Sequence, residues 1–241
     1  MTLKKIIIIG GSGAIGSSLA RTLHKKGYHP VLIARNESDL RLLSEELECD
    51  YFVCDVLDTN KLNEIIENIG DNIFGLSYCA GSIDLKPLKL AKESDYIQSF
   101  KLNTIGAINA IKACQNSLKK NNGSILLFST IAVQQGFVNH TIISSSKGAI
   151  EGLTLALAAE LAPSIKVNCI APSLTDAKMS QNLVKNDNIK KAIEGMHPIP
   201  KIGQGSDFSD IGSYLLSENN KWITGQILHI DGGRSTLRIK A

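Results

Sequence analysis

The sequence predicts an α/β protein with a doubly wound parallel β-sheet and helices on both faces. Apolar runs of strand length recur along the chain, and apolar residues fill them continuously instead of alternating with polar ones. Continuous apolar runs are typical of parallel strands that are covered on both faces. Five of the gaps between the runs are long enough for a helix, and strand–helix–strand repetition implies right-handed crossovers.

The expected strands follow one another along the whole chain. They are 3–10, 29–35, 50–55, 72–81, 123–130, 165–172 and 226–231. The gaps with room for helices are 14–27, 36–48, 58–69, 93–120 and 144–162. In the last gap apolar residues fall at 150, 153, 157 and 161, which is helical spacing. No Pro/Gly/Ser linker or low-complexity segment divides the chain, so one domain over 1–241 is expected.

The segment 176–205 breaks this rhythm. It is polar, helical in part, and ends in a Pro/Gly-rich stretch. It follows an expected strand, and ligands of open α/β sheets bind beyond the carboxyl ends of the strands. We therefore expect a lid over the ligand site. Its apolar residues fit either a pocket lining or a packed amphipathic helix; they are Met179, Leu183, Ile189, Ile193 and Met196.

Composition narrows the classes of function. The chain has 241 residues, 43% of them hydrophobic, and a net charge of +3 without a basic stripe, so nucleic acid is not indicated as a partner. The five cysteines lack CxxC spacing and clustered histidines, which indicates reduced core thiols and no metal site. The apolar run near the N-terminus is too short for a leader peptide or a membrane span, so we expect a soluble, cytoplasmic protein.

The first expected strand runs directly into GGSGAIG. Gly10, Gly13 and Gly16 stand three apart, with Ser12 and Ile15 between them, and a helical pattern follows. Glycines in such a turn let the backbone approach a pyrophosphate, and the helix N-terminus supplies amide donors. The position after a strand and before a helix favours a dinucleotide site over a tight turn without a ligand.

The end of the second expected strand indicates which dinucleotide is bound. An acidic residue usually stands there to hold the adenosine ribose, but this chain has Ala34 followed by Arg35. A guanidinium suits a 2′-phosphate, so NADP is preferred, while Glu37 and Asp39 keep NAD possible. A solvated surface arginine is the alternative. Asp55, at the end of the third strand, is placed to reach the adenine, and its alternative role is a helix N-cap.

The order and spacing of the motifs resemble those of a known family. The chain is similar to the short-chain dehydrogenases/reductases over essentially its full length, in GGSGAIG at 10–16, CDV at 54–56, CAG at 79–81, FST at 128–130, SSSKGAIEGL at 144–153, VNCIAPS at 167–173 and WITGQILHIDGG at 222–233. The resemblance implies a Rossmann-like sheet of about seven strands, a nicotinamide cofactor, a small-molecule substrate and a homo-oligomer, either a dimer or a tetramer. It also implies cofactor contacts from Val56, Ala80, Gly81, Pro172, Ser173 and Thr175.

The catalytic signature of that family is present only in part. The family has a Tyr-x-x-x-Lys pair, in which the lysine holds the nicotinamide ribose and lowers the pKa of the tyrosine, the proton donor. Lys147 matches the lysine, but Ile143 stands where the tyrosine is expected. Thr130 replaces the substrate-binding serine thirteen residues upstream, and Asn103 matches the asparagine of the proton relay. Isoleucine cannot titrate, so the usual general acid is absent.

A different proton donor is therefore expected. His140 is one candidate, with a surface loop histidine as the alternative, and a substrate or water proton is another. Ser144 lacks a base and suits an N-cap, and Asp176 qualifies only if burial raises its pKa. The favoured function is an NADP-dependent oxidoreductase of carbonyl/alcohol substrates with an atypical active site. The alternative is a non-catalytic dinucleotide-binding protein that acts as a regulator or a partner subunit.

Overall fold

The computed structural model describes residues 3–184 and 186–238, which contain one parallel β-sheet. The strands of the sheet follow the order β3-β2-β1-β4-β5-β6-β7. They are β1 (Lys5–Ile9), β2 (His29–Ala34), β3 (Asp50–Val53), β4 (Ile73–Tyr78), β5 (Ser124–Phe128), β6 (Lys166–Pro172) and β7 (Ile227–Ile230). Every neighbouring pair runs parallel, so the predicted doubly wound sheet is confirmed.

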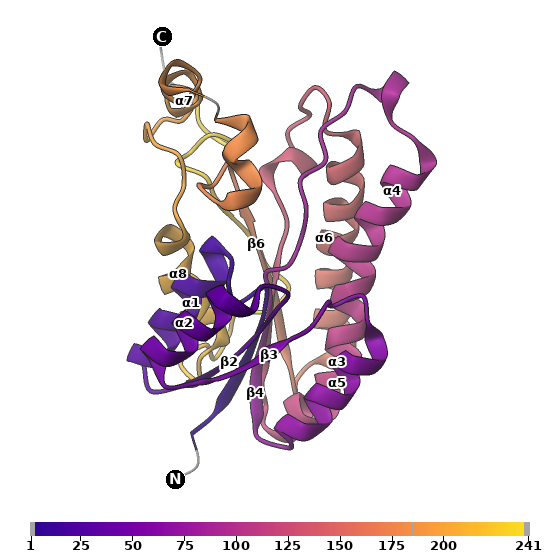
Figure 1. Cartoon of the computed structure of the whole chain (residues 1–241), viewed down its shortest axis with the longest axis vertical. Helices are drawn as coiled ribbons and strands as arrows, with labels where there is room; N and C mark the ends of the chain where they lie inside the picture. Colours follow the sequence, from indigo (N-terminus) through magenta and orange to yellow (C-terminus); the bar gives the residue numbers. More distant parts are fainter. Residues whose placement is uncertain (1–2, 185, 239–241) are drawn as a thin grey trace.

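Helices cover both faces of the sheet (Figure 1). One face carries α1 (Ala14–Lys25), α2 (Glu37–Leu47) and α8 (Gly205–Leu216). The other carries α3 (Thr59–Ile69), α4 (Glu93–Phe100), α5 (Gly106–Lys120) and α6 (Thr141–Leu161). The connections hold the 3-10 helices η1 (Leu88–Leu90), η3 (Ile131–Val133) and η4 (Lys178–Leu183), the π-helix η2 (Lys101–Ile105) and the short helix α7 (Asp187–Glu194).

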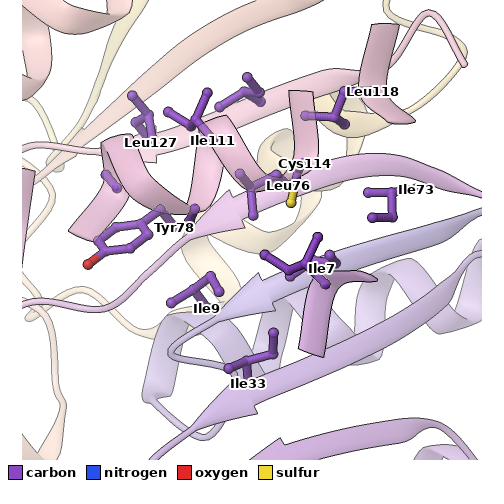
Figure 2. Close-up of a cluster of buried hydrophobic side chains, with 14 of the residues drawn as sticks. Ile7, Ile9, Ile33, Ile73, Leu76, Tyr78, Ile111, Cys114, Leu118 and Leu127 are labelled. Atoms are coloured by element: carbon purple, nitrogen blue, oxygen red, sulfur yellow. The ribbon is translucent and has the colours of Figure 1, made fainter. Parts of the chain in front are cut away.

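The sheet separates two hydrophobic cores, and the isoleucines of β1 show how. Successive side chains of a strand point to opposite faces. Ile7 and Ile9 belong to the core that packs against α3 and α5, whereas Ile6 and Ile8 belong to the core beneath α1, α2 and α8. Figure 2 shows both in the first of these cores, Ile9 next to Tyr78 and Ile7 next to Leu76. Both faces of β1 are therefore buried, which explains its unbroken apolar run.

The order of the strands reverses at β1, and a crevice forms at the carboxyl ends of the strands on either side of this point. β1 pairs with β2 on one side and with β4 on the other. The crossovers that leave these strands turn to opposite faces of the sheet, so the carboxyl ends of β1 and β4 are not covered by a connection. The glycine loop follows β1 directly and opens onto this crevice.

The structure differs from the sequence prediction in three helices. The expected helix 93–120 is interrupted by a π-helical turn at Lys101–Ile105. α6 begins at Thr141, three residues before the predicted start. Residues 205–216, which carried no prediction, form α8, because Phe208 and Leu215 recur at helical spacing and are buried against the sheet.

The segment 176–205 lies beyond the carboxyl end of β6 (Figure 1). It contains η4 and α7, so its partly helical character is as predicted, although Lys185 lies outside the described residues. Among the described helices, none combines the length and the apolar character that a membrane span requires. The five cysteines are free thiols, four of them buried.

Candidate functional site

The loop between β1 and α1 lets a ligand approach its backbone. Gly10 has a φ of +80°, and a Cβ there would lie 2.7 Å from the backbone nitrogen of Ala80. A side chain at Gly16 would collide with the carbonyl group of Gly10. Gly13 is the N-cap of α1, and within the described residues no side chain caps this helix or places a negative charge in its first turn. The N-terminus of α1 is therefore suited to bind an anionic group.

Two adjoining cavities open beyond the strands. The Arg35 cavity, of about 490 Å³, is lined by eight of the predicted cofactor-binding residues: Gly10, Ser12, Gly13, Arg35, Asp55, Val56, Ala80 and Gly81. The Lys147 cavity, of about 530 Å³, is lined by the rest of that set and by the predicted catalytic residues, namely Ile15, Gly16, Pro172, Ser173, Thr175, Asn103, Thr130, His140 and Lys147. Because Gly13 and Gly81 line both, the structure brings every predicted site residue to one pair of connected cavities.

The Arg35 cavity is lined by two cations, Arg35 and Lys178, and by two carboxylates, Asp39 and Asp55. Arg35 is exposed after β2, and Asn36 caps α2 by accepting from the Asp39 amide at 3.2 Å. Lys178 Nζ lies 2.5 Å from Asp39 Oδ2, and both residues line this cavity. Asp39 is thus engaged by a lysine, while Arg35 has no ion-pair partner in the described part of the chain. The unpaired guanidinium of Arg35 suits a phosphate better than a ribose hydroxyl.

Asp55 lines the same cavity and does not cap a helix. Its Oδ1 accepts a hydrogen bond from the Leu57 amide at 3.0 Å. The N-cap of α3 is Asp58, which accepts from the Lys61 amide at 3.1 Å. The N-cap alternative for Asp55 is therefore wrong, and its carboxylate is placed at the cavity wall by a turn of its own.

Lys147 is buried between α6 and the end of β5. Its Nζ donates a hydrogen bond to the carbonyl oxygen of Phe128 at 2.8 Å. Burial lowers the pKa of Lys147 to about 8, and the thiols of Cys169 and Cys79 oppose that shift only in part. At pH 7 the ammonium group is therefore still mainly protonated, and it retains two N–H donors beyond the one that Phe128 accepts.

Asn103 presents an unpaired oxygen beside Lys147. It lies in the π-helical turn, where its Nδ2 donates to the carbonyl oxygen of Ser99 at 3.0 Å. Its buried Oδ1 has no hydrogen-bond partner among the described residues. A Cβ at Gly81 would lie 2.6 Å from this oxygen and 3.5 Å from Lys147 Nζ. Since an unpaired buried acceptor is costly, the space left by Gly81 fits a hydroxyl-bearing ligand that donates to Asn103.

Thr130 brings a hydroxyl group to the same cavity. It follows β5 and caps η3, where its Oγ1 accepts from the Ala132 amide at 3.3 Å. A threonine hydroxyl that accepts in this way still has its own hydrogen to donate. Thr130 is therefore placed to hydrogen-bond the oxygen atom of a ligand in the Lys147 cavity.

Ile143 and His140 lie on the first turn of α6 and line the Lys147 cavity. Ile143 is buried, and its side chain adds only apolar surface. Nδ1 of His140 lies 2.7 Å from the carbonyl oxygen of Val138, so the neutral ring carries its proton on Nδ1 and leaves Nε2 as an acceptor. The ring packs against Phe137 at 5.3 Å between centroids. His140 thus lines the cavity wall from the end of the loop between η3 and α6.

The positions of Ser144 and Asp176 exclude both residues as proton donors. The N-cap of α6 is His140, and Ser144 lies inside the helix with its hydroxyl donating to the Ala132 carbonyl oxygen at 2.8 Å. The N-cap alternative for Ser144 is therefore wrong, and Ser144 does not line the Lys147 cavity. Asp176 is exposed and lines neither cavity, so the burial that its role required is missing.

Two further residues at the site, Arg234 and His197, were not predicted from the sequence. Arg234 lines the Lys147 cavity from the loop after β7. His197 is buried at the end of the segment 176–205, and its Nε2 lies 2.8 Å from Ser173 Oγ. Both residues are far in sequence from the motifs around Lys147. The only sequence signal was the place of Arg234 directly after the DGG of 231–233.

The chain is similar to known reductases along nearly its whole length. It is 30% identical over 232 residues to the 3-oxoacyl-(acyl-carrier-protein) reductase FabG of Rickettsia bellii, covering 94% of this chain and 95% of that protein. It is 27% identical to the 3-oxoacyl-(acyl-carrier-protein) reductase of Homo sapiens, covering 95% and 97% of the two chains. The solved structure of ElxO with NADP bound matches with a TM-score of 0.90 at 28% identity, covering 98% of this chain and 100% of that one.

A family model confirms the predicted resemblance. The model described as enoyl-(acyl carrier protein) reductase matches residues 10–235, which include the glycine loop, both cavities and Arg234. The seven-stranded sheet and the position of the glycine loop agree with this match. The chain therefore belongs to the short-chain dehydrogenase/reductase family of oxidoreductases.

Proposed function

We propose that this chain is an NADP-dependent oxidoreductase that interconverts a carbonyl group and an alcohol, and that Ile143 occupies the position of the family's catalytic tyrosine. The observation that carries the proposal is the arrangement of Lys147, Asn103 and Thr130 around one cavity next to the glycine loop. The names of the relatives as reductases and the NADP bound to ElxO support the reaction type and the cofactor.

The Arg35 cavity fits the adenosine half of NADP. The amides of the glycine loop and of the first turn of α1 bind the pyrophosphate. Arg35 and Lys178 supply the positive charge that a 2′-phosphate requires, while Asp55 and Val56 contact the adenine. The ion pair between Lys178 and Asp39 supports this assignment, because it reduces the negative charge that would favour NAD.

The Lys147 cavity fits the nicotinamide half of NADP, which supplies or accepts the hydride when bound. Asn103 Oδ1 and Lys147 Nζ bind the ribose hydroxyls, so the unpaired oxygen of Asn103 gains a donor. The nicotinamide end is held by residues that follow β6: Pro172, Ser173 and Thr175. The segment 176–205 acts as a lid, since Met179, Leu183 and Ile193 line this cavity, whereas Ile189 and Met196 do not.

The proton is supplied by groups other than a tyrosine. Thr130 donates a hydrogen bond to the substrate oxygen and fixes its position. His140 acts as the proton donor: Val138 holds the proton of the neutral ring on Nδ1, and Nε2 takes a proton from water and passes it on. Lys147 is a second group that still holds a proton at neutral pH. In the oxidative direction the same groups accept the proton.

Replacement of His140 tests this assignment. We expect His140→Ala to lower the turnover of carbonyl substrates at least tenfold, because general acid catalysis contributes at least about that much. His24→Ala removes an exposed histidine on α1, far from both cavities, and serves as the matched control. Unchanged turnover in His140→Ala, with NADPH still bound, would remove His140 from the mechanism and leave Lys147 or water as the donor.

The subunits are expected to associate through α6. Gly152 on α6 has no atom within 4 Å of the place of a Cβ, so a second helix has room to pack closely there, and Leu155 is exposed on the same helix. Sedimentation equilibrium tests this expectation. A dimer or tetramer in the wild type that dissociates in Gly152→Glu supports it, and a monomeric wild type contradicts it.

A further inference from the structure

Arg234 is a cation of the Lys147 cavity that has no part in the proposed binding of the cofactor. Arg234 projects into the cavity from the loop after β7 and is only half-buried. Its guanidinium lies 4.9 Å from the centre of the Phe137 ring, its Nη1 is 3.5 Å from Ser173 Oγ, and its Nη2 is 3.4 Å from Met196 Sδ. No carboxylate of the described residues forms an ion pair with it. These neutral contacts leave most of its five donors without a partner.

The loop that carries Arg234 is held rigidly by its own hydrogen bonds. Asp231 Oδ1 accepts from the Gly233 amide at 2.9 Å, and Oδ2 accepts from the Ser235 amide at 2.8 Å. Gln135 Nε2 donates to the carbonyl oxygen of Ser235 at 2.7 Å. The nearest carboxylate along the chain is therefore engaged by backbone amides and not by the guanidinium.

A buried histidine positions the serine that Arg234 touches. His197 Nδ1 lies 2.8 Å from the carbonyl oxygen of Ile193, so the neutral ring carries its proton there. Its Nε2 therefore accepts from the Ser173 hydroxyl at 2.8 Å, which turns the lone pairs of Ser173 Oγ toward Arg234. The chain Ile193–His197–Ser173–Arg234 fixes one edge of the guanidinium and leaves the rest of it free for a ligand.

The charged side chains of the cavity wall are all cationic. Arg234 and Lys147 line it, and no aspartate or glutamate does so among the described residues. The remainder is largely apolar, with Ile83, Leu85, Val138, Met179, Leu183 and Ile193. A half-buried guanidinium without an ion pair is costly in such surroundings, and burial lowers the pKa of Arg234, a shift that the charge of Asp231 opposes only in part. A bound anion would offset this cost through charge-assisted hydrogen bonds.

We propose that the substrate of this enzyme carries an anionic group, a carboxylate or a phosphate, which pairs with Arg234, and an apolar body that fills the rest of the Lys147 cavity. This inference rests on the proposed function, because it names the substrate class of the same site. Arg234 is then a specificity-determining residue: it binds the end of the substrate that does not react. Ser173 and His197 are positioning residues that hold it.

Binding of simple probes tests the inference without turnover. Hexanoate, hexyl phosphate and neutral hexanamide are titrated calorimetrically into the wild type, Arg234→Met and Arg238→Met. Arg238 is exposed four residues further on and lines neither cavity, so Arg238→Met is the matched control. We expect the wild type and the control to bind at least one anion about tenfold to a hundredfold more tightly than hexanamide, and Arg234→Met to lose this preference.

The outcomes separate this inference from the proposed function. A wild type that binds neither anion more tightly than hexanamide overturns the inference, as does an Arg234→Met variant that keeps the preference. If Arg234→Met does not fold, Arg234→Gln takes its place. The comparison of anion binding with hexanamide binding in the wild type still tests the inference. NADPH consumption is then measured with a medium-chain oxo acid and its methyl ester. Equal turnover of acid and ester contradicts the inference alone, whereas an intact anion preference without any turnover contradicts the oxidoreductase alone.

Discussion

Ile143 and Lys147 lie one helical turn apart on the buried face of α6, and both line the Lys147 cavity. Residues four apart on a helix are stacked on one face, so a side chain at position 143 reaches the space next to the lysine ammonium. In this chain that place holds an aliphatic group. The site therefore combines a buried cation with an aliphatic side chain one helical turn before it.

Ile143→Tyr should place a titratable proton donor beside Lys147. We expect the variant to reduce simple ketones with NADPH faster than the wild type, but by less than the roughly 10²–10⁴-fold that a general acid usually contributes, because His140 already supplies part of this effect. NADPH oxidation against a panel of ketones at pH 7 measures this effect. Ile143→Phe is the control, because it adds the ring without the hydroxyl. If the tyrosine and phenylalanine variants have equal rates, position 143 does not face the reacting oxygen.

Lys147→Met should stabilise the protein without cofactor and weaken NADPH binding. Burial lowers the pKa of Lys147 from 10.5 to about 8, so the folded state disfavours the ammonium group at pH 7. Replacing it with an apolar side chain of similar length should raise the free energy of unfolding by about 1–3 kcal/mol. Urea unfolding at pH 7 and fluorescence titration with NADPH measure the two effects.

The difference in stability between Lys147→Met and the wild type should shrink as the pH rises. Below pH 8 both the folded and the unfolded wild type carry the charge, and the penalty is fully present. Between pH 8 and 10.5 the folded state loses the proton first, so the wild type gains stability relative to Lys147→Met and the gap narrows. A gap that is constant or widens over this range would show that burial of the ammonium is not its cause.

The sequence was sufficient for the sheet because its five inner strands are buried on both faces, while the edge strands β3 and β7 are only partly buried. The isoleucines of β1 alternate between two cores, so the apolar run itself indicated a covered parallel strand. α8 was missed because its small and polar residues dilute the helical spacing of Phe208 and Leu215. The π-helical turn was missed as well, since no local pattern in 93–120 marks where the extra residue enters.

The candidate site was predictable where neighbours in sequence are neighbours in space. The glycine loop and Lys147 belong to local motifs, and both line the expected cavities. Arg234 and His197 reach the site only because the loop after β7 and the end of the segment 176–205 both pack beside Ser173. Such contacts join residues up to 61 positions apart, and one sequence offers no signal for them.

The alkaline limb of the pH–rate profile should follow the titration of Lys147, which binds the nicotinamide ribose as an ammonium group. Carbonyl reduction needs the protonated form, so kcat/KM should be steady below pH 7 and fall as the pH rises through about 8. The fall should persist in His140→Ala, which keeps Lys147. A pH–rate profile that is flat from pH 6 to 10 would show that turnover does not depend on the protonation of Lys147.

Arg35 should decide between the two nicotinamide dinucleotides. We expect Arg35→Ala to weaken NADPH binding about tenfold or more, because a charge-assisted contact with the 2′-phosphate is lost, and to leave NADH binding nearly unchanged. Calorimetric titration with each nucleotide measures the ratio. Arg41→Ala, an exposed arginine further along α2, serves as the control. Equal losses for both nucleotides would assign Arg35 a role outside the 2′-phosphate.

Transfer of deuterium by the wild type is the most direct test of the proposed oxidoreductase. The purified protein is incubated with NADPH that carries deuterium at the reactive carbon and with a panel of ketones and oxo acids, and the products are examined by mass spectrometry. We predict an alcohol that contains one deuterium, formed despite Ile143. NADPH that binds but transfers no deuterium to any carbonyl, while Ile143→Tyr does transfer it, would contradict the proposal and identify a non-catalytic dinucleotide-binding protein.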